Sequence, residues 1–261
     1  MPIPKKIHYV WIGDQAIPVA EQAYILGWQK LNPDFQVIKW SEKDVDYSKY
    51  PLVQKALDEK RYALASDIIR MIVLYQEGGI YLDTDMELYT SLDILTRYDA
   101  AACCEGSCWF GTAFIAAKKA SPWIAAILKR YQILDANTKI NTNTFLKTVH
   151  SPSVYAEKLF GFKVDGKTAF HQPANFKIYS SDYFFPKHYI SGEVRLTPNT
   201  IAFHHYASTW HTPIEAIKCK LSAFSYHLLG AKNYQKLEAK FHKHLARQIL
   251  RDYCPDEARN L

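Results

Sequence analysis

The first forty residues alternate between apolar blocks and polar turns, which predicts a strand, a helix and a second strand. Residues 7–12 (IHYVWI) form a continuous apolar and aromatic run that is typical of a buried strand. Residues 18–31 carry a helical pattern, and the Asn-Pro-Asp sequence at 32–34 marks a turn. Residues 35–40 (FQVIKW) predict the second strand. Because this order is the usual opening of a nucleotide-binding unit, the pattern predicts an α/β fold.

Residues 62–75 are apolar at almost every position, which predicts a helix that is buried on nearly all sides. Its polar members are Ser66, Asp67 and Arg70. Burying a charge costs several kcal/mol unless a partner is present. Asp67 and Arg70 are three residues apart, so they share a helix face and could form an ion pair.

A glycine pair at 78–79 predicts the end of this helix, through a left-handed cap. Residues 80–82 then form a short apolar strand, and a D-T-D sequence stands at its carboxyl end. In open α/β sheets, ligands bind at that end of the strands. Carboxylate oxygens are the preferred ligands of hard divalent cations, so Asp83 and Asp85 are candidate ligands of Mg²⁺ or Mn²⁺.

A second D-x-D, formed by Asp44 and Asp46, lies in a polar stretch that is predicted to be a loop. Charged pairs in such stretches are usually solvated surface groups. We therefore interpret this copy as part of the surface, and the copy that follows the buried helix as the candidate site.

The rest of the chain is predicted to mix short strands with helices. Strands are expected at 86–89, 100–104, 112–117 and 201–203, and helices at 122–131 and 141–149. Residues 161–200 are rich in Phe, Tyr, Pro and Gly, which indicates short strands and loops. No repeat or linker divides the chain, so we expect a catalytic domain over residues 1–210 with a helical extension, 211–261, packed on it.

The last fifty residues are predicted to be helical, with two opposing stripes. The basic stripe consists of Lys232, Lys236, Lys240, Lys243, Arg247 and Arg251. The apolar stripe consists of Tyr234, Leu237, Phe241, Leu245 and Ile249. One interpretation is a terminal helix packed on the body with a solvated basic face. The other is contact between the 231–251 helix and anionic lipid headgroups, with each basic residue near the surface contributing about 1 kcal/mol.

Composition and charge limit the possible binding partners and the cellular compartment. The chain of 261 residues is 48% hydrophobic, enough for a large core, and its net charge of +6 suits nucleic acid, an anionic membrane or a phosphorylated substrate. Its five cysteines include no C-x-x-C pair, which argues against a zinc site and favours a reducing compartment. Neither a signal-peptide core nor a transmembrane-length apolar run is present, so a cytoplasmic location is expected.

Two further stretches carry candidate chemistry. Trp11 ends the first strand, where a flat ring can stack on a nucleobase, although an isolated tryptophan more often belongs to the core. The late sequence HHYASTW begins with His204 and His205, and an imidazole can complete a Mn²⁺ shell while a hydroxyl binds phosphate oxygen. The chain has no P-loop, G-x-G-x-x-G, H-E-x-x-H or G-x-S-x-G sequence.

Three segments together resemble glycosyltransferase family 32: IPKKIHYVWIG at the start, ALASDIIRMIVLYQEGGIYLDTD in the middle and HHYASTW near the end. This family includes initiating mannosyltransferases and bacterial capsular polysaccharide transferases, and the clostridial glucosylating toxins carry a similar pattern. The resemblance extends over roughly residues 3–210. It implies the GT-A fold, with a mixed central sheet and, beyond the resemblance, a helical C-terminal extension.

The resemblance also implies residue roles. The residues expected to contact the nucleotide sugar are Val10, Trp11, Ser66, Asp67, Arg70, Asp83, Ser208 and Trp210. Asp83, Asp85 and Arg70 are the expected catalytic residues. Asp85 and Asp83 would hold the metal with His205, or with His204 as the alternative. The family usually has serine directly before the last tryptophan, where this chain has Thr209, so either Ser208 or Thr209 would hold the phosphate.

The implied activity is metal-dependent transfer of a hexose, with retention, from a UDP-sugar in preference to GDP-mannose. The expected acceptor is a saccharide or lipid-linked saccharide of bacterial cell-surface synthesis, handled in the cytoplasm or on the inner face of the membrane. An effector that glycosylates a host protein is the alternative within the same class. A nucleic-acid-binding protein that uses the basic helix is the alternative from another class, but the basic stripe lies outside the apparent site, so no nucleic acid is expected.

Overall fold

A six-stranded sheet forms the centre of the computed structural model, which describes residues 2–105, 109–134, 137–161, 164, 175–207 and 225–253. Within these residues the strand order is β2-β1-β3-β6-β5-β7. The strands are β1 (Lys6–Val10), β2 (Gln36–Trp40), β3 (Gly79–Leu82), β5 (Ala100–Cys104), β6 (Phe110–Ala117) and β7 (Phe176–Tyr179). Strand β1 is parallel to both of its neighbours, and β6 is antiparallel to both of its own. The predicted mixed α/β sheet is therefore confirmed.

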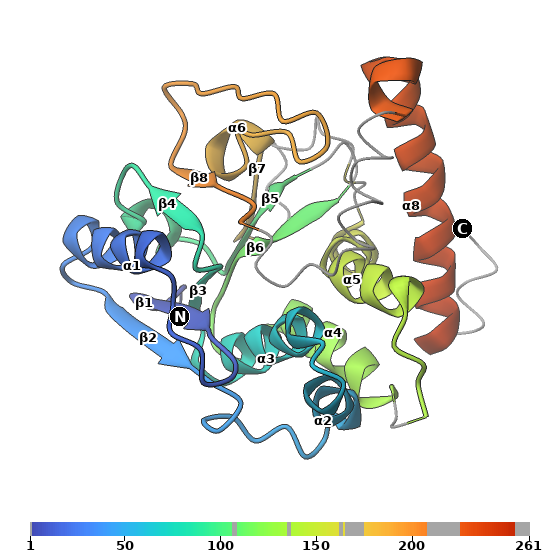
Figure 1. Cartoon of the computed structure of the whole chain (residues 1–261), viewed down its shortest axis with the longest axis horizontal. Coiled ribbons are helices and arrows are strands. Elements are labelled where there is room, and N and C mark those ends of the chain that lie inside the picture. The colour runs from blue at the N-terminus through green and yellow to red at the C-terminus, as the bar shows by residue number, and fades with distance from the viewer. Residues whose placement is uncertain are drawn as a thin grey trace.

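Helices cover both faces of this sheet (Figure 1). They are α1 (Val19–Leu31), α2 (Pro51–Asp58), α3 (Tyr62–Glu77), α4 (Pro122–Gln132), α5 (Thr142–Phe160), the short α6 (Ser181–Phe184) and α8 (Ala231–Tyr253), with a 3₁₀ turn, η1, at Asp93–Leu95. Alternate strand residues point to opposite faces. Tyr81 and Ile115 pack with α2, α3, α4, α5 and α8, whereas Ile80 and Phe114 pack with α1 and α6.

A two-stranded sheet lies beside the end of β3. It pairs β4 (Met86–Leu88) with β8 (Ala202–His204) in antiparallel register, so that Met86 lies opposite His204. This pairing brings the late HHY sequence back to the D-x-D, more than a hundred residues earlier in the chain. Both strands had been predicted, with boundaries that differ by one residue.

The connection from α3 to β3 requires its two glycines. Gly78 and Gly79 have backbone φ angles of +64° and +112°, which residues with a side chain rarely adopt. A Cβ on Gly78 would meet the Lys119 amide nitrogen at 2.5 Å, and one on Gly79 would meet His8 Nε2 at 2.7 Å. The helix ends where the sequence predicts. However, Gly78 combines φ +64° with ψ −175°, which lies outside the left-handed helical region, so the turn is not the left-handed cap that was expected.

Helix α5 is longer than predicted, because it continues through Pro152 to Phe160. Its start is capped by the Asn141 side chain, which accepts a hydrogen bond of 3.0 Å from the Thr144 amide. The indole of Trp123 donates a 2.9 Å hydrogen bond to the carbonyl of Pro152, and this side of the helix is buried against α4. Tertiary packing thus overrides the helix-breaking tendency of proline that the sequence pattern suggests.

Helix α8 packs on α5, but not through the whole apolar stripe that the sequence predicts. Leu245 and Ile249 are buried as expected. In the first half of the helix, Leu237 and Phe241 remain 50% and 44% exposed, and the buried positions are Glu238 and His242. That part of the prediction is wrong, because the α5 surface opposite these positions is polar. None of the described helices combines the length and the apolar character that crossing a bilayer requires.

Candidate functional site

Asp83 and Asp85 lie in the tight turn between β3 and β4, at the carboxyl end of β3. The turn is held by the amide of Asp83, which donates to the Ala113 carbonyl, and by the amide of Met86, which donates to the Asp83 carbonyl, both at 3.0 Å. Strand β8 brings His204 to the same place. One ligand atom from each of Asp83, Asp85 and His204 can be chosen so that all three lie within 4.8 Å of one another. This arrangement suits a cation with two oxygen ligands and one nitrogen ligand.

The carboxylate of Asp85 is oriented from two sides. Its Oδ1 lies 3.2 Å from His204 Nε2, and its Oδ2 accepts a 2.8 Å hydrogen bond from the Ala207 amide. Burial alone would raise the pKa of Asp85, but the hydrogen bond and charge of His204 outweigh it and hold the pKa below its ordinary value. Burial alone would lower the pKa of His204, but Asp85 raises it above the usual range. Each group therefore favours the charged form of the other.

Arg70 links the buried helix to the D-x-D. Its guanidinium lies 3.1 Å from Asp67 Oδ1 and 3.3 Å from Asp83 Oδ1, and it donates a 2.6 Å hydrogen bond to the Thr112 carbonyl. The ion pair predicted from the i, i+3 spacing of Asp67 and Arg70 is thus confirmed. Tyr81 completes this group, because its hydroxyl donates to Asp83 Oδ1 at 2.7 Å and its ring lies 4.4 Å from the guanidinium carbon.

The electrostatics of this group follow from its burial. Asp67 and Arg70 are each only 5% exposed. Burial raises the pKa of Asp67 to about 6, Arg70 opposes this shift, and the nearby charge of Asp83 adds to it. The pKa of Arg70 lies above its ordinary value, since its acidic neighbours outweigh the effect of burial. Ser66 is also buried, with its Oγ 3.4 Å from both the Tyr81 hydroxyl and the Arg70 guanidinium. Arg70 and Tyr81 thus hold the Asp83 carboxylate in place from the buried side of the turn.

Two residues near the cluster were not predicted from the sequence. The hydroxyl of Tyr206 lies close to the Glu105 carboxyl, and the Tyr206 ring lies 4.0 Å from the His204 ring. Burial raises the pKa of Glu105, whose charge also acts on His204. Tyr206 has a φ of +55°, in the left-handed region that residues other than glycine rarely adopt. The unusual backbone at Tyr206 has no sequence signal, and Glu105 carries no motif.

The geometry favours His204 over His205, which was the preferred metal ligand. Successive side chains of an extended segment point in opposite directions. The ring of His205 therefore turns away from Asp85, lies with its Nε2 2.9 Å from Glu87 Oε2 and stacks on Tyr24 at 4.7 Å. His204, which was the alternative, is the histidine that joins the aspartates.

The expected nucleotide-base contact is not open in this structure. Trp11 is 3% exposed, and its indole donates a 2.7 Å hydrogen bond to the Gln15 carbonyl. The neighbouring Val10 is 7% exposed. A ring buried in this way offers no face to a base, although Trp11 belongs to neither cluster of core residues. Ser208, Thr209 and Trp210, the expected phosphate ligands, lie outside the described residues.

Comparison with known proteins identifies the D-x-D segment. Residues 18–101 match the family described as "Glycosyltransferase sugar-binding region containing DXD motif". The chain therefore contains a stretch of this DXD glycosyltransferase type. The matched stretch contains α1, α3 and the D-x-D itself, so the resemblance inferred from the sequence is confirmed where the buried ion pair and the acidic turn lie.

Individual relatives share this DXD region. "Subversion of eukaryotic traffic protein A" of Legionella pneumophila is 27% identical over 111 residues, covering 32% of this chain and 17% of the relative. "Inositol phosphoceramide mannosyltransferase 3" of Schizosaccharomyces pombe is 31% identical over 102 residues, covering 38% of this chain and 28% of the relative. The chain thus matches less than a third of the length of either relative.

A solved structure titled "PaToxG Glycosyltransferase" shares the fold, with a TM-score of 0.51 and 23% identity, over 61% of this chain and 70% of that one. This likeness extends beyond the matched DXD region. It confirms the expected GT-A fold for the central α/β body.

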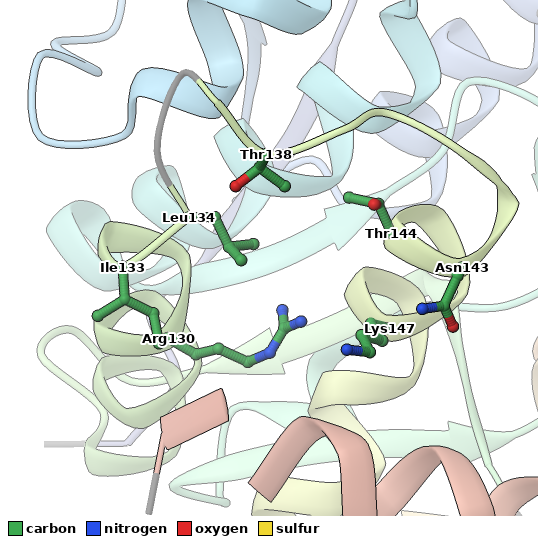
Figure 2. Close-up of a pocket in the computed structure, with 7 residues that line it drawn as sticks. All are labelled: Arg130, Ile133, Leu134, Thr138, Asn143, Thr144 and Lys147. Carbon is green, nitrogen blue, oxygen red and sulfur yellow. The ribbon is translucent and has the colours of Figure 1, made fainter. Parts of the chain in front are cut away.

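Two other features can be separated from the DXD site. Asp44 accepts a 2.7 Å hydrogen bond from the Ser41 amide, and Asp46 accepts one of 2.9 Å from the Ser48 amide, so the second D-x-D stabilises an exposed loop, as its interpretation as surface implies. A cavity of about 340 Å³ lies between the end of α4 and the start of α5 (Figure 2). The cavity shares no residue with the DXD site. It is lined by Arg130, Ile133, Leu134, Thr138, Asn143, Thr144 and Lys147.

Proposed function

We propose that this chain transfers a hexose from a nucleotide diphosphate sugar to an acceptor hydroxyl, in a reaction that depends on a divalent cation. The observation that carries the proposal is the convergence of Asp83, Asp85 and His204 at the end of β3, inside the region that matches the DXD family. The donor set fits the cation. His204 supplies a nitrogen, which favours Mn²⁺ over Mg²⁺, and its buried Nδ1 has no hydrogen-bond partner among the described residues.

Asp83, Asp85 and His204 would hold the cation, which would supply positive charge beside the departing diphosphate. The protein's own residues keep the ligands in place before the reaction begins. His204 and the Ala207 amide orient Asp85, while Arg70 and Tyr81 orient Asp83. Because the surrounding side chains are fixed and buried, little reorganisation is needed as charge develops.

The proposed stereochemical course is retention by a front-face displacement. The bond from the acceptor oxygen to the anomeric carbon forms on the face from which the diphosphate leaves, and the leaving phosphate oxygen accepts the acceptor's proton. This course needs no carboxylate nucleophile. Both aspartates of the D-x-D are already engaged with Arg70 and His204.

The donor is proposed to be a UDP-sugar in preference to GDP-mannose, on the sequence resemblance to bacterial family members. Asp67 and Arg70 were expected to touch the ribose or sugar. Since both side chains are buried, we propose that they act on the donor through Asp83, which is the more exposed partner. Val10, Ser66, Ser208 and Trp210 remain proposed donor contacts, and Trp11 would join them only if its ring became exposed on donor binding.

The acceptor is proposed to be a saccharide or lipid-linked saccharide of bacterial cell-surface synthesis, reached in the cytoplasm at the inner face of the membrane. A second candidate is a host protein. The relatives that share the DXD region include the Legionella protein above and "Toxin Afp18" of Yersinia ruckeri, which favours an effector-like acceptor. Incubation with labelled donor and either membrane lipids or host-cell lysate separates the two by where the label is recovered.

The test of the catalytic proposal is the substitution Asp85→Asn, which keeps the shape of the side chain and an acceptor for the Ala207 amide. We expect donor hydrolysis and transfer in the presence of Mn²⁺ to fall by at least about a hundredfold. The matched control is Asp46→Asn, in the surface D-x-D, which should retain full activity. A thermal-shift screen of UDP- and GDP-sugars with and without Mn²⁺ identifies the donor. Full activity of Asp85→Asn would remove the metal role.

A further inference from the structure

The exposed face of α8 combines a row of cations with apolar side chains. The basic row consists of Lys232, Lys236, Lys240, Lys243, Arg247 and Arg251, all of which are exposed. Leu237 and Phe241 lie one helical turn apart beside this row, and they are 50% and 44% exposed. Leu228, just before the helix, is 73% exposed. An amphipathic helix in a globular protein ordinarily turns such leucine and phenylalanine side chains inward.

The packing of α8 explains why these apolar side chains stay outside. The buried positions of α8 include Glu238 and His242, followed by Leu245 and Ile249. His242 Nδ1 lies 3.4 Å from His150 Nδ1 of α5, so the orientation of the helix is fixed by polar as well as apolar contacts. Turning the helix to bury its exposed apolar pair would withdraw these buried residues from the core. The exposed apolar pair is thus built into the way α8 docks on the body.

Four lysines of the basic row have no acidic partner in the part of the chain that the structure describes. Lys232, Lys236, Lys240 and Lys243 form no ion pair with any carboxylate among residues 2–105, 109–134, 137–161, 164, 175–207 and 225–253. Figure 1 shows α8 along the outer edge of the molecule, with α5 between it and the sheet. The row is therefore accessible to an extended anionic partner.

We propose that this face of α8 binds the surface of an anionic lipid bilayer. The basic row would lie at the level of the lipid phosphates, and Leu237 and Phe241 would enter the boundary between headgroups and acyl chains. A nucleic acid would satisfy the row equally well but leaves the exposed apolar pair without a partner. A bilayer satisfies both features at once. The inference does not depend on the proposed transferase activity, since an inactive protein would bind in the same way.

The experiment is flotation of the full chain with vesicles of phosphatidylcholine alone and of equimolar phosphatidylcholine and phosphatidylglycerol. We expect binding to the anionic vesicles only. The double variant Lys236→Gln/Lys240→Gln should weaken it about twenty-five-fold, because each lysine near the surface contributes about a factor of five. The variant Leu237→Ser/Phe241→Ser keeps the charge and should weaken binding to the same vesicles at least tenfold by the loss of apolar insertion.

The matched control is Leu26→Ser, at a position of α1 that is 64% exposed and distant in sequence from α8. It should bind vesicles as the wild type does, and circular dichroism should show all variants folded. The proposal is overturned if the wild type does not bind anionic vesicles, or if binding survives in Leu237→Ser/Phe241→Ser. It is equally overturned if competing DNA or RNA removes the protein from the vesicles with the steep salt dependence of phosphate binding. A dimer whose formation is abolished by Leu237→Ser/Phe241→Ser would also overturn it.

Discussion

Helices α3 and α8 place their charged side chains in opposite environments. α3 buries Asp67 and Arg70 in the interior, where Asp83 and the Thr112 carbonyl lie within reach of the guanidinium. α8 keeps its basic row in solvent and buries Glu238 and His242, while Leu237 and Phe241 remain partly exposed. α3 has three charged residues among sixteen and α8 has eight among twenty-three, so both helices must place charges either in the interior or in solvent.

The difference lies in what each helix meets. The charges of α3 face the acidic turn after β3, so burial there supports a ligand site. His242 of α8 faces His150 and Glu157 of α5, so burial there only fixes the orientation of the helix. A buried charge therefore indicates a functional site where it pairs with a group that solvent can reach. Arg70 does so with Asp83, whose side chain is 29% exposed.

The largest expected effect on stability comes from breaking the ion pair of α3. Arg70→Met removes a buried cation and leaves Asp67 and Asp83 without compensation, so we expect the free energy of unfolding to fall by about 3–5 kcal/mol. Urea denaturation followed by circular dichroism measures this change. The matched control is Lys236→Met in α8, an exposed lysine whose loss should change stability by less than about 0.5 kcal/mol.

A double variant shows whether the loss comes from the pair itself. Adding Asp67→Asn to Arg70→Met removes one of the uncompensated charges and should recover part of the lost stability. If Arg70→Met alone cost no more than Lys236→Met, the guanidinium would not be holding the acidic turn. The buried charge of α3 and the exposed charge of α8 would then contribute equally to stability.

A smaller effect separates the two halves of α8. Ile249 is fully buried and Phe241 is 44% exposed, although the sequence pattern places both on one apolar stripe. Ile249→Ala should lower the free energy of unfolding by about 2–4 kcal/mol through the cavity it leaves. Phe241→Ala should cost less than about 1 kcal/mol, because solvent already reaches much of its ring. Equal losses would show that the helix lies with its predicted stripe inward.

The segment from α3 to the D-x-D could be predicted almost to the residue, because its signals are local. A helix apolar on all sides, a glycine pair and a three-residue apolar run leave few alternatives, and the i, i+3 spacing of Asp67 and Arg70 fixes their pairing. The face that α8 buries could not be predicted in the same way. It depends on His150 and Glu157, which lie some ninety residues away in the sequence and carry no helical pattern that relates them to α8.

The candidate site divides along the same line. Asp83 and Asp85 follow from the strand that precedes them. The choice between His204 and His205 depends on the pairing of β8 with β4, in which His204 lies opposite Met86. A shift of one residue in that register would exchange the two imidazoles. No pattern within the HHY sequence specifies this long-range register.

The last prediction uses pH, because the buried groups beside α3 and α8 respond to acid with opposite signs. Burial, with a smaller contribution from His242, lowers the pKa of His150 to about 3. The unfolded chain therefore binds a proton below about pH 6.5 that the folded chain excludes, and stability is lost as the pH falls. Burial raises the pKa of Asp67 to about 6, so the folded chain binds a proton there that the unfolded chain does not yet bind. The contribution of Asp67 to stability therefore grows as the pH falls from 6 to 4.

The variant His150→Phe isolates the first of these effects. His150 packs between Trp109 and Phe241, with the His242 ring beside it, so an aromatic side chain fits the site without a titrating group. Between pH 7 and pH 5 the variant should lose about 2 kcal/mol less stability than the wild type, measured by urea denaturation at each pH. If the two proteins lost the same amount, His150 would be protonated within the fold. The buried contact of α8 on α5 would then have to accommodate a charge, as that of α3 does.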